Sequence, residues 1–180
     1  MFILYKLSLR SGLCKIWTVP DCQPVRTLRG HTINACSVAW HPRATISQDT
    51  STINLASSAF DGSVKLWNME SEEPFAEIEG TLHTMSHRSI ENAFEILILG
   101  HAPFRVAKVK FHPSGRFLAT AWYVTDRCLF LDNYYFFFSY DHSWRLWDLE
   151  TQDEVLHQEG HSKAVHDITF QCDGSLSATA

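Results

Sequence analysis

Short stretches in which apolar and polar residues alternate recur along the chain and predict β-strands. Val64 and Leu66 alternate with polar neighbours, and Ile168 and Phe170 do the same near the other end of the chain. A period of two predicts strands with one buried face. Asp-Gly and Pro-Ser-Gly segments separate such stretches and are typical of hairpin turns. The pattern therefore predicts an all-β chain of short antiparallel strands.

A Gly-His pair opens each of several similar units. The pairs are Gly30-His31, Gly100-His101 and Gly160-His161. Each is followed by an alternating stretch that ends in an aromatic residue, and the first two units continue with a Leu-Ala-Ser or Leu-Ala-Thr run. A turn aspartate then precedes a tryptophan by six residues. Self-similarity of this kind predicts a repeat architecture.

The Asp-to-Trp segment occurs in full at residues 61–67 and 141–147, and residues 11–18 (SGLCKIWT) repeat it with serine in place of aspartate. Four short strands in about 40–45 residues, marked by Gly-His and Trp-Asp, are the pattern of a β-propeller blade. On these motifs the sequence resembles the WD-repeat family over roughly 140 of its 180 residues. The resemblance implies an all-β, partial WD40 β-propeller. It would have four-stranded antiparallel blades, about three of the family's seven, in a ring that is not closed.

In that family a histidine, a serine or threonine, an aspartate and a tryptophan of one blade form a hydrogen-bonded structural tetrad. Indole, hydroxyl, imidazole and carboxylate groups complement one another as donors and acceptors. The resemblance implies two tetrads and four further repeat markers. The tetrads are His31, Ser57, Asp61, Trp67 and His101, Thr120, Asp141, Trp147, and the markers are Trp17, Gly30, Gly160 and His161.

Two segments interrupt the repeat. His31 and His101 are 70 residues apart, and His101 and His161 are 60 apart, against an expected period of about 40–45. The surplus falls at residues 81–100 and 123–139, and the second segment holds 7 of the chain's 23 aromatic residues. Neither segment shows the alternating periodicity of a blade. The pyrimidine-rich end of an intron, when it is translated in frame, encodes runs such as Phe-Phe-Phe-Ser. We interpret both as translated introns or gene-model errors; the alternative is a genuine loop insertion at a blade edge.

Residues 1–10 lie outside the repeat, and residues 11–180 form the predicted partial propeller. The N-terminal stretch has no basic region and no small-residue cleavage site, so it does not indicate a signal peptide. The apolar runs are far shorter than the ~20 residues that span a bilayer. Five widely spaced cysteines without a C-x-x-C pair argue against a disulfide framework or a zinc site. The net charge of −5 provides no general attraction to nucleic acid.

The sequence offers little for catalysis or metal binding. Residues 141–143 (Asp-His-Ser) are the residue types of a hydrolase triad, but as neighbours in a turn they point in different directions. His83 and His87 have the spacing of helical metal ligands, but they lie in segment 81–100 without a third ligand. We expect a non-enzymatic protein with no catalytic residue, cofactor, metal or small-molecule substrate, and with no membrane partner.

Basic residues are spread along the predicted strands, where we expect them on solvated faces; no RNA-binding motif is present. They are Arg43, Lys65, Lys108, Lys110, Arg116 and Arg145. Trp17, Trp67 and Trp147 are expected in the core. For Trp144, three positions before Trp147, the sequence leaves a core position and a partner contact open.

Three stretches narrow the resemblance within the family. They are residues 60–80, 112–120 and 140–176. They resemble WD-repeat proteins of spliceosomal small nuclear ribonucleoproteins. That resemblance implies a nuclear, non-catalytic scaffold in pre-mRNA splicing. Its expected partners are splicing-factor proteins of the U4/U6 particle and, in the assembled particle, U4/U6 snRNA.

Two other interaction roles remain open: a generic WD-repeat scaffold and a substrate receptor of a cullin-type ubiquitin ligase. Such receptors typically carry Trp-Asp-x-Arg. Here the third residue after Trp67 is Glu70, and the third after Trp147 is Glu150, which opposes the receptor role. Because a propeller needs closure to remove its open edges, we expect the isolated chain to be poorly soluble or partly unfolded.

Overall fold

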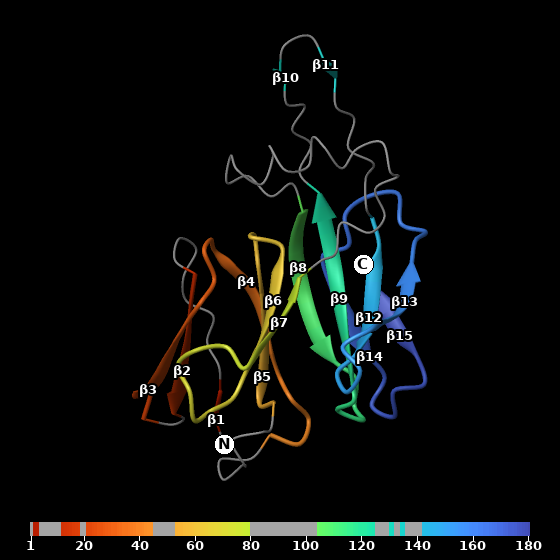
Figure 1. Cartoon of the computed structure of the whole chain (residues 1–180). Helices are drawn as coiled ribbons and strands as arrows, with labels where there is room; N and C mark the ends of the chain where they lie inside the picture. The colour runs from red at the N-terminus through yellow and green to blue at the C-terminus, as the bar shows by residue number, and fades with distance from the viewer. Residues whose placement is uncertain are drawn as a thin grey trace.

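The computed structural model is a row of antiparallel β-sheets (Figure 1). The structure describes residues 2–3, 12–18, 21–44, 53–79, 104–124, 130–131, 134–135 and 142–180. Every regular element within these ranges is a strand. No helix that could cross a membrane occurs in them.

The first complete blade is a four-stranded sheet in chain order. Its strands are β4 (Ala35–Trp40), β5 (Leu55–Ala59), β6 (Ser63–Trp67) and β7 (Ala76–Glu79). Each pairs antiparallel with the next. The two central strands are buried at every position because other blades or strands cover both of their faces.

The second complete blade has the same strand order. Its strands are β8 (Phe104–Phe111), β9 (Phe117–Val124), β12 (Trp144–Asp148) and β13 (Glu154–Gln158). Between β9 and β12 the chain forms a separate hairpin of β10 (Phe130–Leu131) and β11 (Tyr134–Tyr135). The last two residues of β9, Tyr123 and Val124, pair with β8, so the blade strand continues into segment 123–139. Most of that segment and all of segment 81–100 lie outside the described residues.

A half-blade stands at each end of the row (Figure 1). At one end β1 (Phe2–Ile3), β2 (Leu13–Thr18) and β3 (Pro24–Arg29) form a sheet in that order. At the other end β14 (Ile168–Phe170) pairs with β15 (Ser177–Thr179). The predicted all-β fold, a partial propeller of four-stranded antiparallel blades in an open ring, is confirmed.

The hydrophobic core lies between neighbouring blades rather than inside one. One cluster joins β2 and β3 to the first complete blade, with Ile16 and Leu28 packed against Leu55 and Trp67. A larger cluster joins the two complete blades. Its buried members are Ala56, Val64, Leu66, Ile78, Val106, Val109, Phe111, Leu118, Trp122 and Trp147. Burial of apolar surface between blades is thus the main force that holds the row together.

Candidate functional site

The four residues of the first implied tetrad lie within one hydrogen-bonded chain. The Trp67 indole donates to Ser57 Oγ at 2.7 Å, and Ser57 Oγ lies 2.7 Å from His31 Nε2. On the other side of the ring, His31 Nδ1 lies 3.0 Å from Ser63 Oγ. The Ser63 hydroxyl donates to Asp61 Oδ1 at 2.6 Å. Ser63, which the sequence reasoning missed, links the histidine to the aspartate.

The hydrogen bond from Ser63 to Asp61 determines the direction of the bond between His31 and Ser63. Because the Ser63 hydroxyl gives its one proton to Asp61, its oxygen accepts the Nδ1–H of His31. On the other side of the ring, Ser57 Oγ receives the Trp67 indole proton and lies beside His31 Nε2. This network of hydrogen bonds links β5 and β6 to the loop before β4.

Asp61 is the last group of this hydrogen-bonded network and is present as a carboxylate. Burial works against its ionisation, but hydrogen bonds from His31 and from the side chain and backbone of Ser63 outweigh burial and hold the pKa of the carboxyl well below its ordinary value of 3.8. Its second oxygen accepts from the Thr32 backbone N–H at 2.9 Å. Asp61 therefore joins the β5–β6 turn to residues 31–32, which precede β4.

This pKa predicts how stability depends on pH. A carboxyl with a lowered pKa in the folded state stabilises the fold fully above its unfolded-state pKa, near 3.8, and the contribution is lost as pH falls towards the folded-state pKa. We expect Asp61→Asn to lower the free energy of unfolding by about 1–2 kcal/mol at pH 7 and to flatten its fall below pH 4. Urea unfolding at a series of pH values measures both effects. An unchanged acid limb in the variant would contradict this role of Asp61.

In the second complete blade one hydroxyl oxygen accepts hydrogen bonds from two indoles. Thr120 Oγ1 accepts from Trp147 Nε1 at 3.0 Å and from Trp122 Nε1 at 2.9 Å. Trp122 was not among the residues singled out from the sequence, although its position two residues after Thr120 on an alternating strand places both side chains on one face. His101 and Asp141, the other two members of this implied tetrad, lie outside the described residues.

The four repeat markers have different surroundings. His161 Nε2 lies 2.7 Å from Thr179 Oγ1 in an exposed position. The indole N–H of Trp17 is buried and has no hydrogen-bond acceptor among the described residues. Gly30 lies close to the Trp67 ring. A Cβ added at Gly30 would come within 3.2 Å of a carbon atom of that ring. Gly160 has open space around it.

A second repeated arrangement links successive blades. His41, just after β4, donates from Nε2 to the carbonyl of Gly115 at 3.0 Å, because its Nδ1 accepts from the Arg43 backbone N–H. His112, just after β8, donates from Nε2 to the carbonyl of Gly174 at 3.1 Å. We call these two contacts the inter-blade histidine bonds. The sequence signal is a histidine directly after the aromatic residue that ends a strand.

Each histidine ring also contacts an aromatic ring of the next blade. His41 meets Phe111 edge-on with ring centroids 5.0 Å apart, and His112 meets Phe170 in the same way at 5.1 Å. The repeated geometry shows that the two junctions are built alike. The inter-blade histidine bonds therefore help to set the position of each blade against its neighbour.

The expectation that the basic residues occupy solvated strand faces is wrong for Lys65 and Arg145, which are buried. Lys65 forms an ion pair with Glu77 across β6 and β7, and Arg145 pairs with Glu154 at 3.0 Å. The Arg145 guanidinium also lies over the Trp122 ring at 4.9 Å. Buried charges need such partners, so both residues belong to the blade interior.

Trp67 and Trp147 are buried, as expected, whereas Trp17 and Trp144 are partly exposed. Among the described residues, no group of three or more His, Cys, Asp or Glu side chains has a geometry that could hold a metal ion. His83, His87 and Asp141 lie outside them.

Comparison with known proteins agrees with this geometry. The profile of the family "WD domain, G-beta repeat" matches residues 22–68 and 94–148. Over 151 residues, or 83% of the chain, the sequence is 33% identical to the U4/U6 small nuclear ribonucleoprotein PRP4 of Saccharomyces cerevisiae, of which the match covers 24%. Over 49 residues, or 27% of the chain, it is 53% identical to the U4/U6 small nuclear ribonucleoprotein Prp4 of Bos taurus, of which the match covers 9%.

A WD repeat-containing protein of Schizosaccharomyces pombe is 32% identical over 111 residues, which is 61% of the chain and 20% of that protein. The chain thus spans a quarter or less of the length of these curated relatives. The two ranges matched by the family profile together cover more than half of the chain.

Proposed function

The chain belongs to the WD40-repeat family, and we propose that it acts as a non-catalytic scaffold of the U4/U6 small nuclear ribonucleoprotein and of the U4/U6·U5 tri-snRNP in pre-mRNA splicing. The observation that carries the proposal is the 33% identity to yeast PRP4, which extends over 83% of the chain. A propeller fold alone would not specify this role, because the same architecture hosts many functions.

The geometry supports a scaffold rather than an enzyme. The buried hydroxyls, imidazole and indoles of the tetrads are used in hydrogen bonds to one another. Groups held in this way stabilise the blades and are not free for chemistry on a substrate. What the blades offer to partners is a rigid surface.

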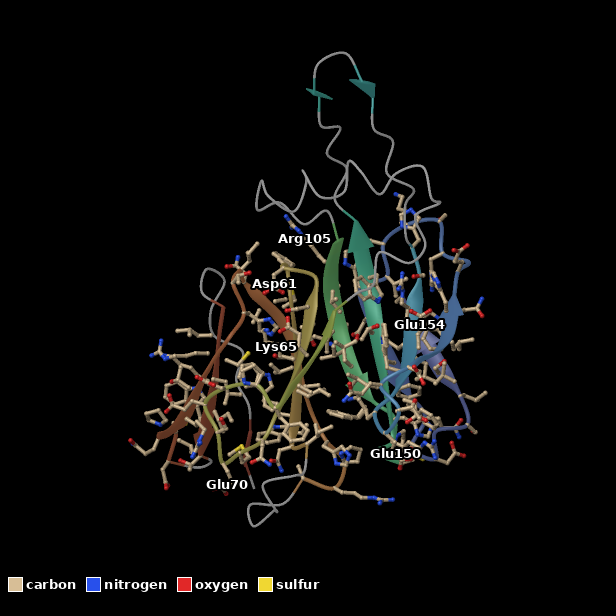
Figure 2. The ribbon with its side chains drawn as sticks, viewed as in Figure 1. Asp61, Lys65, Glu70, Arg105, Glu150 and Glu154 are labelled. Carbon is tan, nitrogen blue, oxygen red and sulfur yellow. The ribbon has the colours of Figure 1, made fainter. Side chains whose placement is uncertain are left out.

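In this proposal the partners are splicing-factor proteins of the U4/U6 particle and, once it is assembled, U4/U6 snRNA, in the nucleus. Residues 11–180 would supply the propeller part. Residues 1–10 and segments 81–100 and 123–139 would be additions to it. The competing ubiquitin-ligase receptor needs arginine where the chain has Glu70 and Glu150, two exposed carboxylates at equivalent turns (Figure 2).

The test is affinity purification of the tagged protein that carries this chain from nuclear extract, followed by quantification of co-purified RNA and proteins. We expect U4 and U6 snRNA at least about tenfold above the level recovered with an unrelated tagged propeller, a difference of roughly 1.4 kcal/mol in apparent binding. Absence of both RNAs, with cullin subunits in their place, would overturn the proposal. Recovery of neither RNA nor cullin would also overturn it.

A further inference from the structure

Equivalent turns follow β4, β8 and β14, the first strands of successive blades, and they differ at one exposed position. The turns are residues 41–44, 112–115 and 171–174, and in each of them the fourth residue donates its backbone N–H to the carbonyl of the first at 2.9 Å. The third residue is exposed in every case, and it is Arg43, Ser114 and Asp173 in chain order. The same place in the fold therefore accepts a positive charge, a neutral hydroxyl or a negative charge.

Asp173 shows how this position stabilises an anion. Its Oδ1 accepts from the backbone N–H and from the hydroxyl of Ser175, each at 2.9 Å. These hydrogen bonds hold the pKa of the Asp173 carboxyl below its ordinary value of 3.8. In the preceding turn the Arg116 backbone N–H makes the equivalent bond to Ser114 Oγ, at 3.3 Å. An anion at Ser114 would therefore meet the same backbone donor, with an arginine side chain where the next turn has Ser175.

Two side chains that bind anions surround the Ser114 turn. The His112 imidazole meets the Phe117 ring edge-on, with centroids 5.9 Å apart. The Arg116 guanidinium lies 5.4 Å from the centroid of the same ring. Because both groups contact one ring beside the turn, their nitrogen atoms lie around the residue between them, Ser114. Imidazolium and guanidinium groups are the usual donors to a phosphate.

Arg116 has one nitrogen that is held only weakly. Its Nε and Nη2 donate to Asp148 at 3.0 and 2.7 Å. Its Nη1 lies 3.5 Å from Glu150, and both side chains of this pair are largely in solvent, 48% and 69% exposed. An exposed ion pair of this kind contributes little to stability. Nη1 is therefore able to turn from Glu150 to a phosphate at Ser114 while the bonds to Asp148 are kept.

The Ser114 hydroxyl also touches one of the inter-blade histidine bonds. Ser114 N–H donates to His112 Nδ1 at 3.1 Å, and Ser114 Oγ lies 2.7 Å from the same nitrogen. Since Nδ1 accepts, the proton of the imidazole is on Nε2, which donates to the Gly174 carbonyl of the next blade at 3.1 Å. A change of charge at Ser114 therefore acts directly on the histidine that joins two blades.

We propose that Ser114 is a phosphorylation site and that its phosphate strengthens the junction between the second complete blade and the blade that begins with β14. A protein kinase transfers the γ-phosphoryl group of ATP. The bond from Ser114 Oγ to phosphorus forms, the bond from that phosphorus to the bridging oxygen of ADP breaks, and the hydroxyl proton is released.

The phosphate then accepts hydrogen bonds from the side chains on both sides of it. Arg116 donates from Nη1. His112 takes up a proton from water at Nδ1 and donates it to the phosphate, while Nε2 keeps its bond to Gly174. Charge-assisted hydrogen bonds are roughly twice as strong as neutral ones, so the junction gains stability. The modification is independent of the proposed splicing role, because neither RNA nor a splicing factor takes part in it.

Mass spectrometry of the trypsin-digested protein tests whether the site is used. Trypsin cleaves after Lys110 and Arg116, and the peptide between the cuts, residues 111–116 (FHPSGR), contains a single hydroxyl side chain. The protein that carries this chain is incubated with ATP and an extract of the cells that express it. We expect this peptide to gain one phosphate, and Ser114→Ala to abolish that gain. A peptide that stays unmodified, both in the extract and in protein isolated from cells, would overturn the proposal.

Insertion of phosphoserine by an expanded genetic code measures the effect on the junction. Ser114→phosphoserine should raise Tm by about 2–4 °C. Measured within each background, this gain should fall by about half or more in His112→Gln and in Arg116→Gln. Ser175→phosphoserine is the matched control, because it places the same group in the equivalent turn beside Asp173 and should lower Tm by like-charge repulsion. Equal shifts at the two positions, no rise at Ser114, or a rise that is undiminished in both glutamine variants would contradict the proposed contacts.

Discussion

Replacing Thr120 with valine is expected to lower the free energy of unfolding by about 2–4 kcal/mol. Thr120 is fully buried, and its hydroxyl oxygen accepts the indole protons of both Trp122 and Trp147. Valine has nearly the same shape but no acceptor, so two buried N–H groups lose their partner at once. Each such group costs about 1–3 kcal/mol when it is left unsatisfied.

Urea unfolding followed by tryptophan fluorescence measures this loss directly. Thr120→Ser is the matched control, because it keeps the oxygen and removes only a methyl group, and it should cost about 1 kcal/mol. If valine and serine destabilised the chain equally, the hydroxyl would not be the source of the effect. A loss below about 0.5 kcal/mol for valine would show that the two indoles find other acceptors.

Replacing Gly115 with alanine is expected to cost about 2–4 kcal/mol, because two unfavourable terms combine. Gly115 has a φ of +80°, a left-handed conformation that costs a residue with a Cβ about 1–2 kcal/mol. The added Cβ would also lie 2.6 Å from Nε2 of His41. That contact forces the imidazole away from the Gly115 carbonyl and breaks the inter-blade histidine bond.

A double-mutant cycle with His41→Ala separates these two terms. Removing the imidazole removes the clash, so Gly115→Ala in the His41→Ala background should cost only the backbone term of about 1–2 kcal/mol. Thermal or urea unfolding of the four proteins gives the coupling energy. Strict additivity of the two changes would show that the histidine and the glycine do not interact.

The positions of the blades along the chain follow from local pattern. Gly-His pairs, alternating stretches and the Asp-to-Trp interval predict strands and turns because each depends on neighbours within about ten residues. The resemblance to the WD-repeat family also implies which groups approach within a blade, and the structure places His31 Nε2 within hydrogen-bond distance of Ser57 Oγ, which accepts the Trp67 indole proton. Ser63 was missed because serine in a turn is common and has no distinctive spacing.

Burial of the basic side chains was not predictable in the same way. Lys65 and Arg145 stand at positions where alternation allows either a solvated or a covered face. Their acidic partners, Glu77 and Glu154, come from the adjacent outer strands. The Trp122 ring under Arg145 comes from a third strand, β9. A buried ion pair depends on this three-dimensional surrounding, because an isolated strand pattern does not show which face is covered.

The sequence by itself determined the strand content and the repeat, which follow from short-range periodicity. Its resemblance to the WD-repeat family implied the residues of the tetrad in the first complete blade. Only the tertiary structure decided how the blades join. The bond from His41 to Gly115 spans 74 residues, and that from His112 to Gly174 spans 62. Such contacts depend on how whole sheets stack, and therefore on the apolar surface buried between blades, which no local pattern specifies.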